Sequence, residues 1–307
     1  MELAPQGPVR LAEDFYLLGH PAVPVFLLDG PEPVIFEAGF ACLAQTYLAD
    51  ARQVLGPRRP AWLLLSHAHF DHCGAAGWFQ RAWPGMRTAA APKAAKILAR
   101  PNAIKLIGQL NQAAAQGLAG MGQGLAGDGV FLPFTLERTV DDGQVLSLRG
   151  GREVRVLATP GHTWDSLSFH IPALQILVAS EAVGTDSPGG YIVSEFLVSY
   201  GAYTESMRRL ASLEVELLCL GHHAVHRGAR ARGFFAKSLA AAEQFKDWVL
   251  RLLAQEGGDA ARVVELVRAG EYDHRPQPKQ PLPAYLLNLQ ARVACLAREF
   301  GGPAQPG

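Results

Sequence analysis

The segment Leu63–Gly74, LLLSHAHFDHCG, constrains this chain more than any other feature of its sequence. The apolar run over residues 61–66 predicts a buried strand, because its apolar residues are consecutive rather than alternating. His67 and His69 lie two residues apart at the extended end of this strand, so they project to the same side and can share an ion. Imidazole and carboxylate donors suit catalytic sites for Zn, Fe or Mn. The segment therefore predicts a metal site that begins with four ligands: His67, His69, Asp71 and His72.

Two further histidines each follow a predicted strand and a glycine. His162 comes after the predicted strand 153–158 in the segment ATPGHT, and His222 comes after the predicted strand 216–220 in LGHH. Gly161 lets the backbone turn sharply before the imidazole, as a ligand on a tight loop requires. We expect both histidines to be ligands, with His223 as the alternative to His222.

Taken in order, HAHFDH, TPGHT and LGH resemble the motif series of the metallo-β-lactamase fold superfamily over roughly residues 14–226. This resemblance implies an α/β fold, a four-layer αβ/βα sandwich with a binuclear metal site at one edge. It also implies which residues hold the two divalent ions: His67, His69 and His162 for one, and Asp71, His72 and His222 for the other. Zn is the first expectation for both ions, with Fe or Mn as alternatives.

One position departs from the family pattern. The family usually places a bridging Asp after the next strand, whereas here the predicted strand 175–179 is followed by Ser180 and Glu181. Glu181 supplies a carboxylate, but its extra methylene moves the oxygens outward by ~1.5 Å. Either the ions shift, or the bridge is looser and one ion binds weakly. We expect Glu181 to bridge the ions, with Asp186 as the alternative carboxylate.

The resemblance implies hydrolytic chemistry. Two ions would lower the pKa of a bridging water toward ~7 and supply hydroxide at neutral pH, while Asp71 orients the hydroxide and carries the proton. The predicted reaction is hydrolysis of a carboxylic ester, thioester or lactone of a small or medium-sized molecule. Two alternatives stay open: a ligand-binding or regulatory protein with vestigial activity, motivated by Glu181, and a mononuclear iron dioxygenase of a thiol-derived substrate. The presence of Asp71, His72 and His222 counts against the dioxygenase.

At a finer level, the chain resembles the quinolone-signal response proteins, a thioesterase-like group with helices after the core. The early stretch LLGHPAVPVFLL, the segment HFDHCG and the helical C-terminal pattern carry this looser resemblance. It favours an ester or thioester substrate.

The charge balance excludes some partners. The chain has 28 Lys and Arg against 28 Asp and Glu, so no net field attracts nucleic acid or an anionic membrane. We therefore expect a small-molecule substrate. The four cysteines have no paired CxxC spacing, which suits a reducing compartment. The N-terminal sequence lacks a secretory pattern and no apolar run reaches the ~20 residues of a spanning helix, so we expect a cytoplasmic protein.

The pattern along the chain predicts a catalytic domain over residues 1–228, with a helical insert at about 100–128, and a helical extension over 229–307. Within the extension the predicted helices cover residues 229–256, 258–270 and 283–299. These helices either cover the metal-binding edge of the sandwich with apolar side chains, or they only pack against the domain or form a homodimer interface. Both alternatives stay open.

Overall fold

The computed structural model describes residues 7–120, 129–187, 190–275 and 280–301. The chain divides into two compact units, Met1–Ala158 with Leu167–Val178, and Thr159–Ser166 with Ala179–Gly307. The fold belongs to the predicted α/β class, with two sheets, flanking helices and helices at the C-terminal end. The predicted boundary between a catalytic domain and a helical extension after residue 228 is not the boundary between these two units, and it stays a prediction.

A seven-stranded sheet forms the centre of the first unit. Its strands follow one another in chain order: β1 (Val9–Ala12), β2 (Phe15–Leu18), β3 (Val25–Leu28), β4 (Val34–Phe36), β5 (Trp62–Leu64), β6 (Arg87–Ala90) and β7 (Arg138–Thr139). The pairings from β1 to β4 are antiparallel, and those from β4 to β7 are parallel. Strands β4 and β5 are buried along their whole length, as expected for parallel strands covered on both faces.

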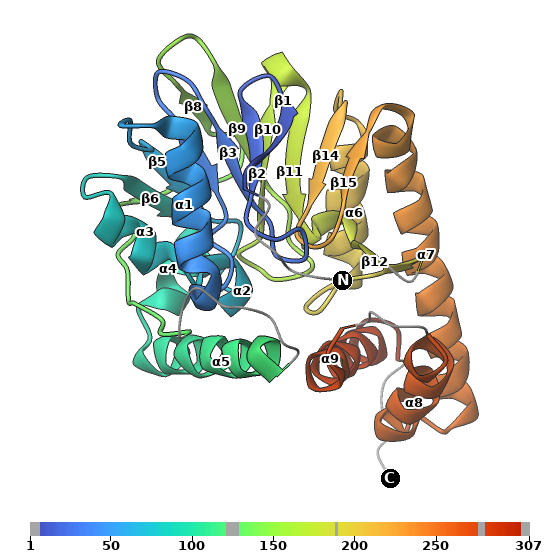
Figure 1. The fold of residues 1–307 in the computed structure, drawn as a ribbon. Helices are drawn as coiled ribbons and strands as arrows, with labels where there is room; N and C mark the ends of the chain where they lie inside the picture. Colours follow the sequence, from blue (N-terminus) through green and yellow to red (C-terminus); the bar gives the residue numbers. More distant parts are fainter. Residues whose placement is uncertain (1–6, 121–128, 188–189, 276–279, 302–307) are drawn as a thin grey trace. The chain divides into compact units, whose positions relative to one another are not determined.

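The helices of this unit are η1 (Ala41–Leu43), α1 (Ala44–Leu55), α2 (Phe70–Cys73), α3 (Ala76–Ala82), α4 (Pro92–Leu98) and α5 (Pro101–Gly120). Helices α1 and α3 are neighbours in the fold (Figure 1). The rings of Tyr47 on α1 and Phe79 on α3 meet edge to face with their centres 6.2 Å apart. Helix α5 forms the predicted insert up to residue 120, and residues 121–128 of that insert lie outside the described residues.

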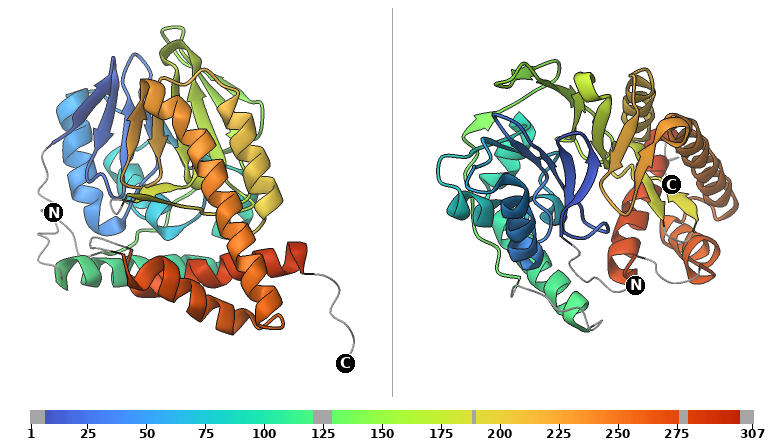
Figure 2. Two further views of the ribbon diagram at one scale, coloured as in Figure 1. Left: turned by 90° about the vertical axis from the view of Figure 1, so that its right-hand side faces the viewer. Right: turned by 45° about the horizontal axis from the view of Figure 1, so that its top comes forward.

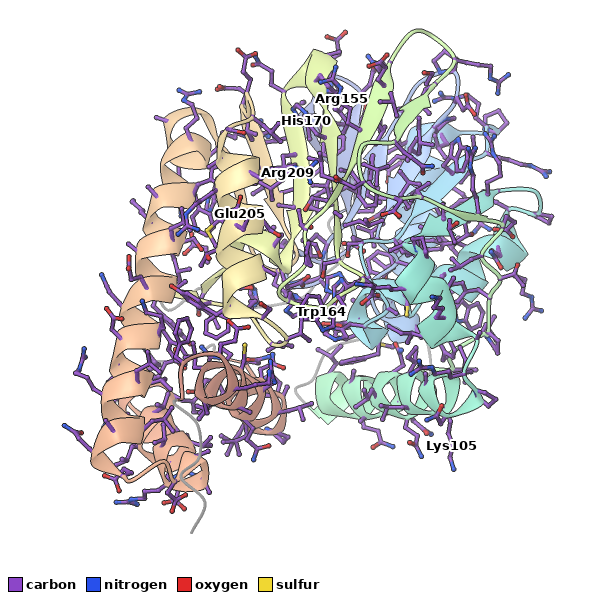
Figure 3. The ribbon with its side chains drawn as sticks, turned by 180° about the vertical axis from the view of Figure 1, so that it is seen from behind. Lys105, Arg155, Trp164, His170, Glu205 and Arg209 are labelled. Atoms are coloured by element: carbon purple, nitrogen blue, oxygen red, sulfur yellow. The ribbon has the colours of Figure 1, made fainter. Side chains whose placement is uncertain are left out.

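A second sheet in the first unit is antiparallel. It contains β8 (Val145–Ser147), β9 (Glu153–Ala158), β10 (Leu167–Ile171) and β11 (Ile176–Ser180), with the short helix η2 (Pro172–Leu174) between the last two. Arg155 and His170 face each other across β9 and β10 (Figure 3). The two sheets pack through aromatic side chains, since the rings of Phe36 on β4 and Phe169 on β10 lie 5.6 Å apart. The apolar core of this unit therefore lies between the sheets.

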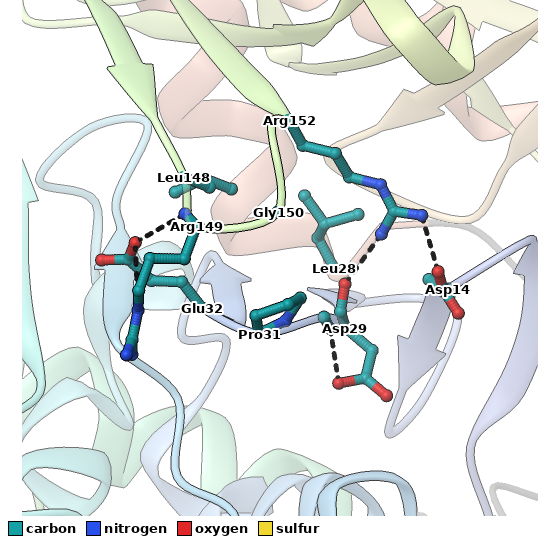
Figure 4. A pocket seen from close by; sticks show the side chains of 10 residues that line it. Asp14, Leu28, Asp29, Pro31, Glu32, Leu148, Arg149, Gly150 and Arg152 are labelled. Carbon is teal, nitrogen blue, oxygen red and sulfur yellow. Dashed lines mark hydrogen bonds and ion pairs between the residues drawn. The ribbon is translucent and has the colours of Figure 1, made fainter.

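A small hollow of about 180 Å³ lies between the turn before β4 and the turn before β9 (Figure 4). Arg152 donates to an Asp14 carboxylate oxygen at 2.6 Å and to the Asp29 carbonyl at 3.0 Å. The Arg149 amide donates to Glu32 at 3.0 Å. Because β4 and β5 are parallel, this hollow lies at the end of the sheet opposite to His67. Its charged groups join the two sheets to each other.

The second unit contains two β-hairpins and the C-terminal helices. Its elements are η3 (Glu181–Val183), β12 (Thr185–Ser187), β13 (Tyr191–Val193), α6 (Tyr200–Ala211), β14 (Leu217–Leu220), β15 (Val225–Arg227), α7 (Gly228–Gln255), α8 (Ala260–Val267), η4 (Arg268–Asp273) and α9 (Leu282–Phe300). Figure 2 shows α7 as one long helix, with α8 and α9 packed against the part of it nearest its C-terminal end. The helices predicted at 229–256 and 283–299 match α7 and α9. The one predicted at 258–270 is split into α8 and the π-helix η4.

A buried ion pair holds the C-terminal helices together. Arg292 on α9 is 1% exposed and donates to Glu271 of η4 at 2.9 Å, and Tyr285 donates to the same carboxylate at 2.7 Å. The guanidinium also lies over the ring of Phe245 on α7, 4.3 Å from its centre. Burial alone would raise the pKa of Glu271, but Arg292 and Tyr285 outweigh it and lower that pKa. Among the described residues, no helix is both long and apolar enough to cross a membrane.

Candidate metal centre

The predicted ligands of the HAHFDH segment follow β5 directly. The strand ends at Leu64, the backbone bends at Ser66, His69 is extended, and α2 begins at Phe70. His67 and His72 are buried, at 1% and 2% exposure, while His69 and Asp71 are partly exposed. The amide of Leu167, at the start of β10, donates to the Ser66 carbonyl at 2.9 Å and anchors the segment to the second sheet of this unit. Two imidazoles are therefore fixed in the protein and two side chains reach toward solvent.

The four side chains of this segment lie close together. The ring centres of His67 and His69 are 4.5 Å apart, and those of His67 and His72 are 4.4 Å apart. Asp71 Oδ2 lies 3.9 Å from His72 Nε2. Donor atoms in each of these pairs lie within 4.8 Å of one another, a spacing at which one small ion can bind two of them. The predicted same-side projection of His67 and His69 agrees with this geometry.

Two side chains outside the segment hold its imidazoles. Ser66 Oγ lies 2.8 Å from His67 Nδ1, and Glu37 Oε1 lies 3.4 Å from His72 Nδ1. The other carboxylate oxygen of Glu37 accepts from the Ser66 amide at 3.3 Å. Both contacts engage Nδ1, so both rings offer Nε2 as the remaining donor. Such outer partners fix the tautomer and the orientation of a metal ligand.

Sequence reasoning missed Glu37. It follows the apolar strand β4, is 2% exposed, and has a left-handed backbone with φ of 69°. A charged residue at the end of a buried strand and just before Ala38-Gly39 is the signal that would have identified it. A carboxylate so deeply buried requires a partner of opposite charge or several donors, and the Ser66 amide and the His72 ring meet part of that requirement.

His162 lies on the predicted tight loop. Gly161 has φ of 133°, and a Cβ at this position would lie 2.3 Å from Tyr203 Cα, so only glycine fits. The Gly161 carbonyl accepts from three successive amides, those of Leu197, Val198 and Ser199, at 3.1–3.3 Å. His162 is 4% exposed, and its Nδ1 lies 2.6 Å from the Glu195 carbonyl oxygen. The ring therefore also presents Nε2.

The side chain of Glu195 is a buried acid close to two predicted ligands. Burial raises the pKa of Glu195 to about 7, against the lowering effect of Arg292, and the charge of Glu181 raises it further. The cause is that burial deprives the carboxyl group of water, so below about pH 7 Glu195 is a buried neutral acid near Glu181.

Glu181 and His222 meet in the second unit. Glu181 directly follows β11 and is 3% exposed, and its Oε1 lies 3.0 Å from His222 Nε2. Ser180, with a left-handed φ of 52°, donates its hydroxyl to Glu181 Oε2 at 2.6 Å. A Cβ on Gly221 would lie 2.2 Å from Glu181 Oε1. The glycine before His222 thus makes the room that the long glutamate side chain needs.

Asp186 and His223, the alternatives to Glu181 and His222, have other surroundings. Asp186 lies on β12 and pairs with His226 at 3.2 Å and with Arg230 at 2.9 Å. His223 has a left-handed φ of 61°, and its ring centre lies 6.3 Å from that of His222. The assignment of Glu181 and His222 as ligands stays a prediction, and the geometry gives each a defined partner.

The donor chemistry fits divalent ions of the predicted kind. Imidazole nitrogens together with carboxylate oxygens are the donors that Zn, Fe and Mn use in catalytic sites. Three of the four cysteines lie on elements that carry no predicted ligand, and Cys73, on α2, is fully buried. The arrangement offers nitrogen and oxygen donors with no thiolate among the predicted ligands.

Comparison with known proteins places the chain among proteins of one superfamily. The sequence model of the metallo-beta-lactamase superfamily matches residues 19–222. A hydroxyacylglutathione hydrolase of Mesorhizobium japonicum (strain LMG 29417 / CECT 9101 / MAFF 303099) is 35% identical over 78 residues, which are 25% of this chain. The matched segment spans 29% of that relative's length.

Solved structures support the same fold. A metallo-beta-lactamase family protein from Thermus thermophilus matches with a TM-score of 0.64 at 20% identity, covering 97% of each chain. An archaeal superfamily protein from Sulfolobus tokodaii matches with a TM-score of 0.58 at 16% identity, covering 92% of this chain and 98% of its own. A B3 metallo-beta-lactamase described as having an active-site glutamic acid matches with a TM-score of 0.58 at 22% identity, covering 79% of this chain and 91% of its own.

Proposed function

Because the chain belongs to the metallo-beta-lactamase superfamily, we propose that it is a metal-dependent hydrolase of a carboxylic ester, thioester or lactone. The observation that carries the proposal is the HAHFDH segment, where four donors lie together at the end of β5, His67 Nδ1 contacts Ser66 Oγ at 2.8 Å and His72 Nδ1 lies 3.4 Å from the Glu37 carboxylate. A chain that used the fold only as a scaffold would have no need for such outer partners.

The proposal assigns two divalent ions to seven residues. His67, His69 and His162 would hold one ion, Asp71, His72 and His222 would hold the other, and Glu181 would supply a further carboxylate. Zn is the proposed metal, with Fe and Mn as the alternatives that the same donors accept. When bound, the ions supply an activated water at neutral pH and polarise the substrate carbonyl.

The side chains of the protein complete the chemistry. Asp71 is partly exposed and lies next to His72, so its carboxylate can orient the attacking water and take up its proton. Ser66 and Glu37 keep two imidazoles in one orientation, which reduces the reorganisation that the reaction requires. In this mechanism no serine or cysteine acts as the nucleophile.

The substrate is proposed to be a small or medium-sized molecule rather than a nucleic acid. The zero net charge supports this, because a polyanion would need a surplus of Lys and Arg. The partial match to a hydroxyacylglutathione hydrolase favours a thioester within the proposed class.

Metal analysis combined with a substrate panel tests the proposal. The purified protein is analysed for Zn, Fe and Mn, loaded with the metal found, and assayed against thioesters, lactones, carboxylic esters and phosphodiesters. We expect about two ions per chain and hydrolysis of a carboxylic ester, thioester or lactone. His67→Ala is expected to lose both the metal and the activity.

Two results would favour the other hypotheses. One iron per chain, with oxygen consumption on a thiol-derived substrate, would support the mononuclear dioxygenase. Metal-loaded protein that cleaves nothing in the panel would support a ligand-binding or regulatory role with vestigial activity.

A further inference from the structure

A second cavity lies in the second unit, beside the loop that carries His162. It has a volume of about 320 Å³ and is lined by Trp164, Leu197, Val198, Ser199, Arg298 and Glu299. Ligand pockets in proteins range from ~300 to 1,000 Å³, so this cavity can hold a small acyl group.

The cavity is tied to the candidate metal centre by backbone hydrogen bonds. The amides of Leu197, Val198 and Ser199 all donate to the Gly161 carbonyl, one residue before His162. Trp164 is two residues after His162 and is 52% exposed, which is unusual for so large an apolar side chain (Figure 3). Hydrogen bonds therefore connect residues that line the cavity directly to the loop that carries His162.

The lining of the cavity includes apolar side chains and one guanidinium group. Trp164, Leu197 and Val198 supply apolar surface. Arg298, near the end of α9, donates Nη2 to the Val198 carbonyl at 2.7 Å, and within the described part of the chain it pairs with no carboxylate. A guanidinium held by one hydrogen bond at the rim of an apolar cavity can receive a carboxylate from a ligand.

Glu299 lines the same cavity but does not cancel this charge. Its two carboxylate oxygens accept from the amides of Tyr200 and Gly201, each at 3.1 Å, at the N-terminal end of α6. The partial positive charge of this helix end compensates the carboxylate. The same contacts fasten the end of α9 to α6, which holds Arg298 in its place.

We propose that this cavity is the acyl subsite of the enzyme and that the substrate is an ester or thioester whose acyl part ends in a carboxylate. Trp164, Leu197 and Val198 contact the apolar middle of the acyl chain, and Arg298 pairs with the terminal carboxylate. This inference rests on the proposed hydrolase function and adds the substrate class to it.

Two matched esters test the inference. Mono-p-nitrophenyl glutarate and p-nitrophenyl valerate have acyl chains of equal length and share a leaving group, and they differ in the terminal carboxylate. We expect the metal-loaded protein to prefer the glutarate ester in kcat/KM. Arg298→Gln is expected to reduce the ratio of the two kcat/KM values by at least about tenfold, as for loss of a hydrogen bond to a charged group. Arg208→Gln removes an exposed guanidinium that pairs with Glu205 outside the cavity, so this control keeps the ratio.

The binding of free glutarate, measured by calorimetry on the same proteins, separates the two levels of the proposal. If neither these esters nor any thioester, lactone or carboxylic ester of the panel is cleaved, the hydrolase function fails, and glutarate binding at least about tenfold weaker in Arg298→Gln than in Arg208→Gln would still support the subsite. If esters are cleaved with the same ratio in wild type and Arg298→Gln, the subsite is overturned while the hydrolase function stands. Equal glutarate binding by the two variants likewise overturns the subsite.

Discussion

Glu181 and His222 are in contact at 3.0 Å between carboxylate Oε1 and imidazole Nε2, over a glycine that has no room for a side chain. The sequence predicted a problem at this position, because glutamate is longer than the aspartate usual in the family. The structure shows how the extra length is accommodated. Gly221 leaves open the space that Oε1 occupies, and Ser180 fixes the second oxygen by a hydrogen bond at 2.6 Å.

Gly221→Ala is therefore expected to move the Glu181 carboxylate, because the new Cβ would lie 2.2 Å from Oε1. We expect fewer metal ions per chain, measured by elemental analysis after dialysis against dilute metal. Gly233→Ala on α7 is the matched control, because a Cβ there meets nothing within 4 Å. Equal metal content in both variants would refute the role given to Glu181.

Glu37→Gln tests the contact that sequence reasoning missed. The change preserves the size of the side chain and removes the charge beside His72 Nδ1. Loss of an outer partner of a metal ligand usually weakens metal binding by about 10- to 100-fold, and we expect an effect of this size in a competition assay with a coloured chelator. Glu153→Gln, at an exposed carboxylate on β9, is the control. An unchanged dissociation constant of the metal in Glu37→Gln would show that Glu37 does not support metal binding through His72.

The stability of the metal-free protein should depend on pH through Glu195. Burial raises the pKa of Glu195 to about 7, so between about pH 4.5 and 7 the folded state holds a proton that the unfolded state releases. The free energy of unfolding is therefore expected to fall as pH rises through this window, by at most about 1.4 kcal/mol per pH unit from this group.

Urea unfolding of wild type and Glu195→Gln at a series of pH values measures this contribution. The variant cannot release the proton, so its stability relative to wild type should increase from pH 5 to pH 7 and level off above that. A difference that is constant across the window would show that Glu195 titrates normally.

The buried pair of Arg292 and Glu271 gives a prediction for the C-terminal helices. Arg292→Met leaves the Glu271 carboxylate buried with Tyr285 as its remaining side-chain donor among the described residues, and removal of one partner of a buried pair costs about 3–5 kcal/mol. Adding Glu271→Gln removes the uncompensated charge and should restore a large part of the lost stability. A double variant no more stable than Arg292→Met, measured by denaturant unfolding, would contradict this interpretation.

Much of the local structure could be predicted from sequence where one pattern decided it. The consecutive apolar residues before Ser66 predicted β5, and the strand–glycine–histidine pattern predicted the positions of His162 and His222 after their strands. Gly161 was predicted to be needed for a sharp turn, and its φ of 133° confirms it.

Other features depend on contacts between distant residues, which sequence spacing does not show. Glu37 lies 35 positions before His72 in the chain, and the parallel pairing of β4 with β5 brings them together. Glu195 was missed because its backbone carbonyl, rather than its side chain, contacts His162. The π-helix η4 was predicted as ordinary helix, because its sequence, RAGEYD, follows α8 without a proline that would end the helix.

The most direct test of the central claim is the metal content of the purified protein beside that of His67→Ala and of the control His274→Ala, which lies outside the predicted ligand set. We expect about two divalent ions per chain in wild type and in His274→Ala, and loss of metal and of ester or thioester hydrolysis in His67→Ala. Wild-type protein that takes up no divalent ion, or a His67→Ala variant that keeps full metal content, would contradict the account.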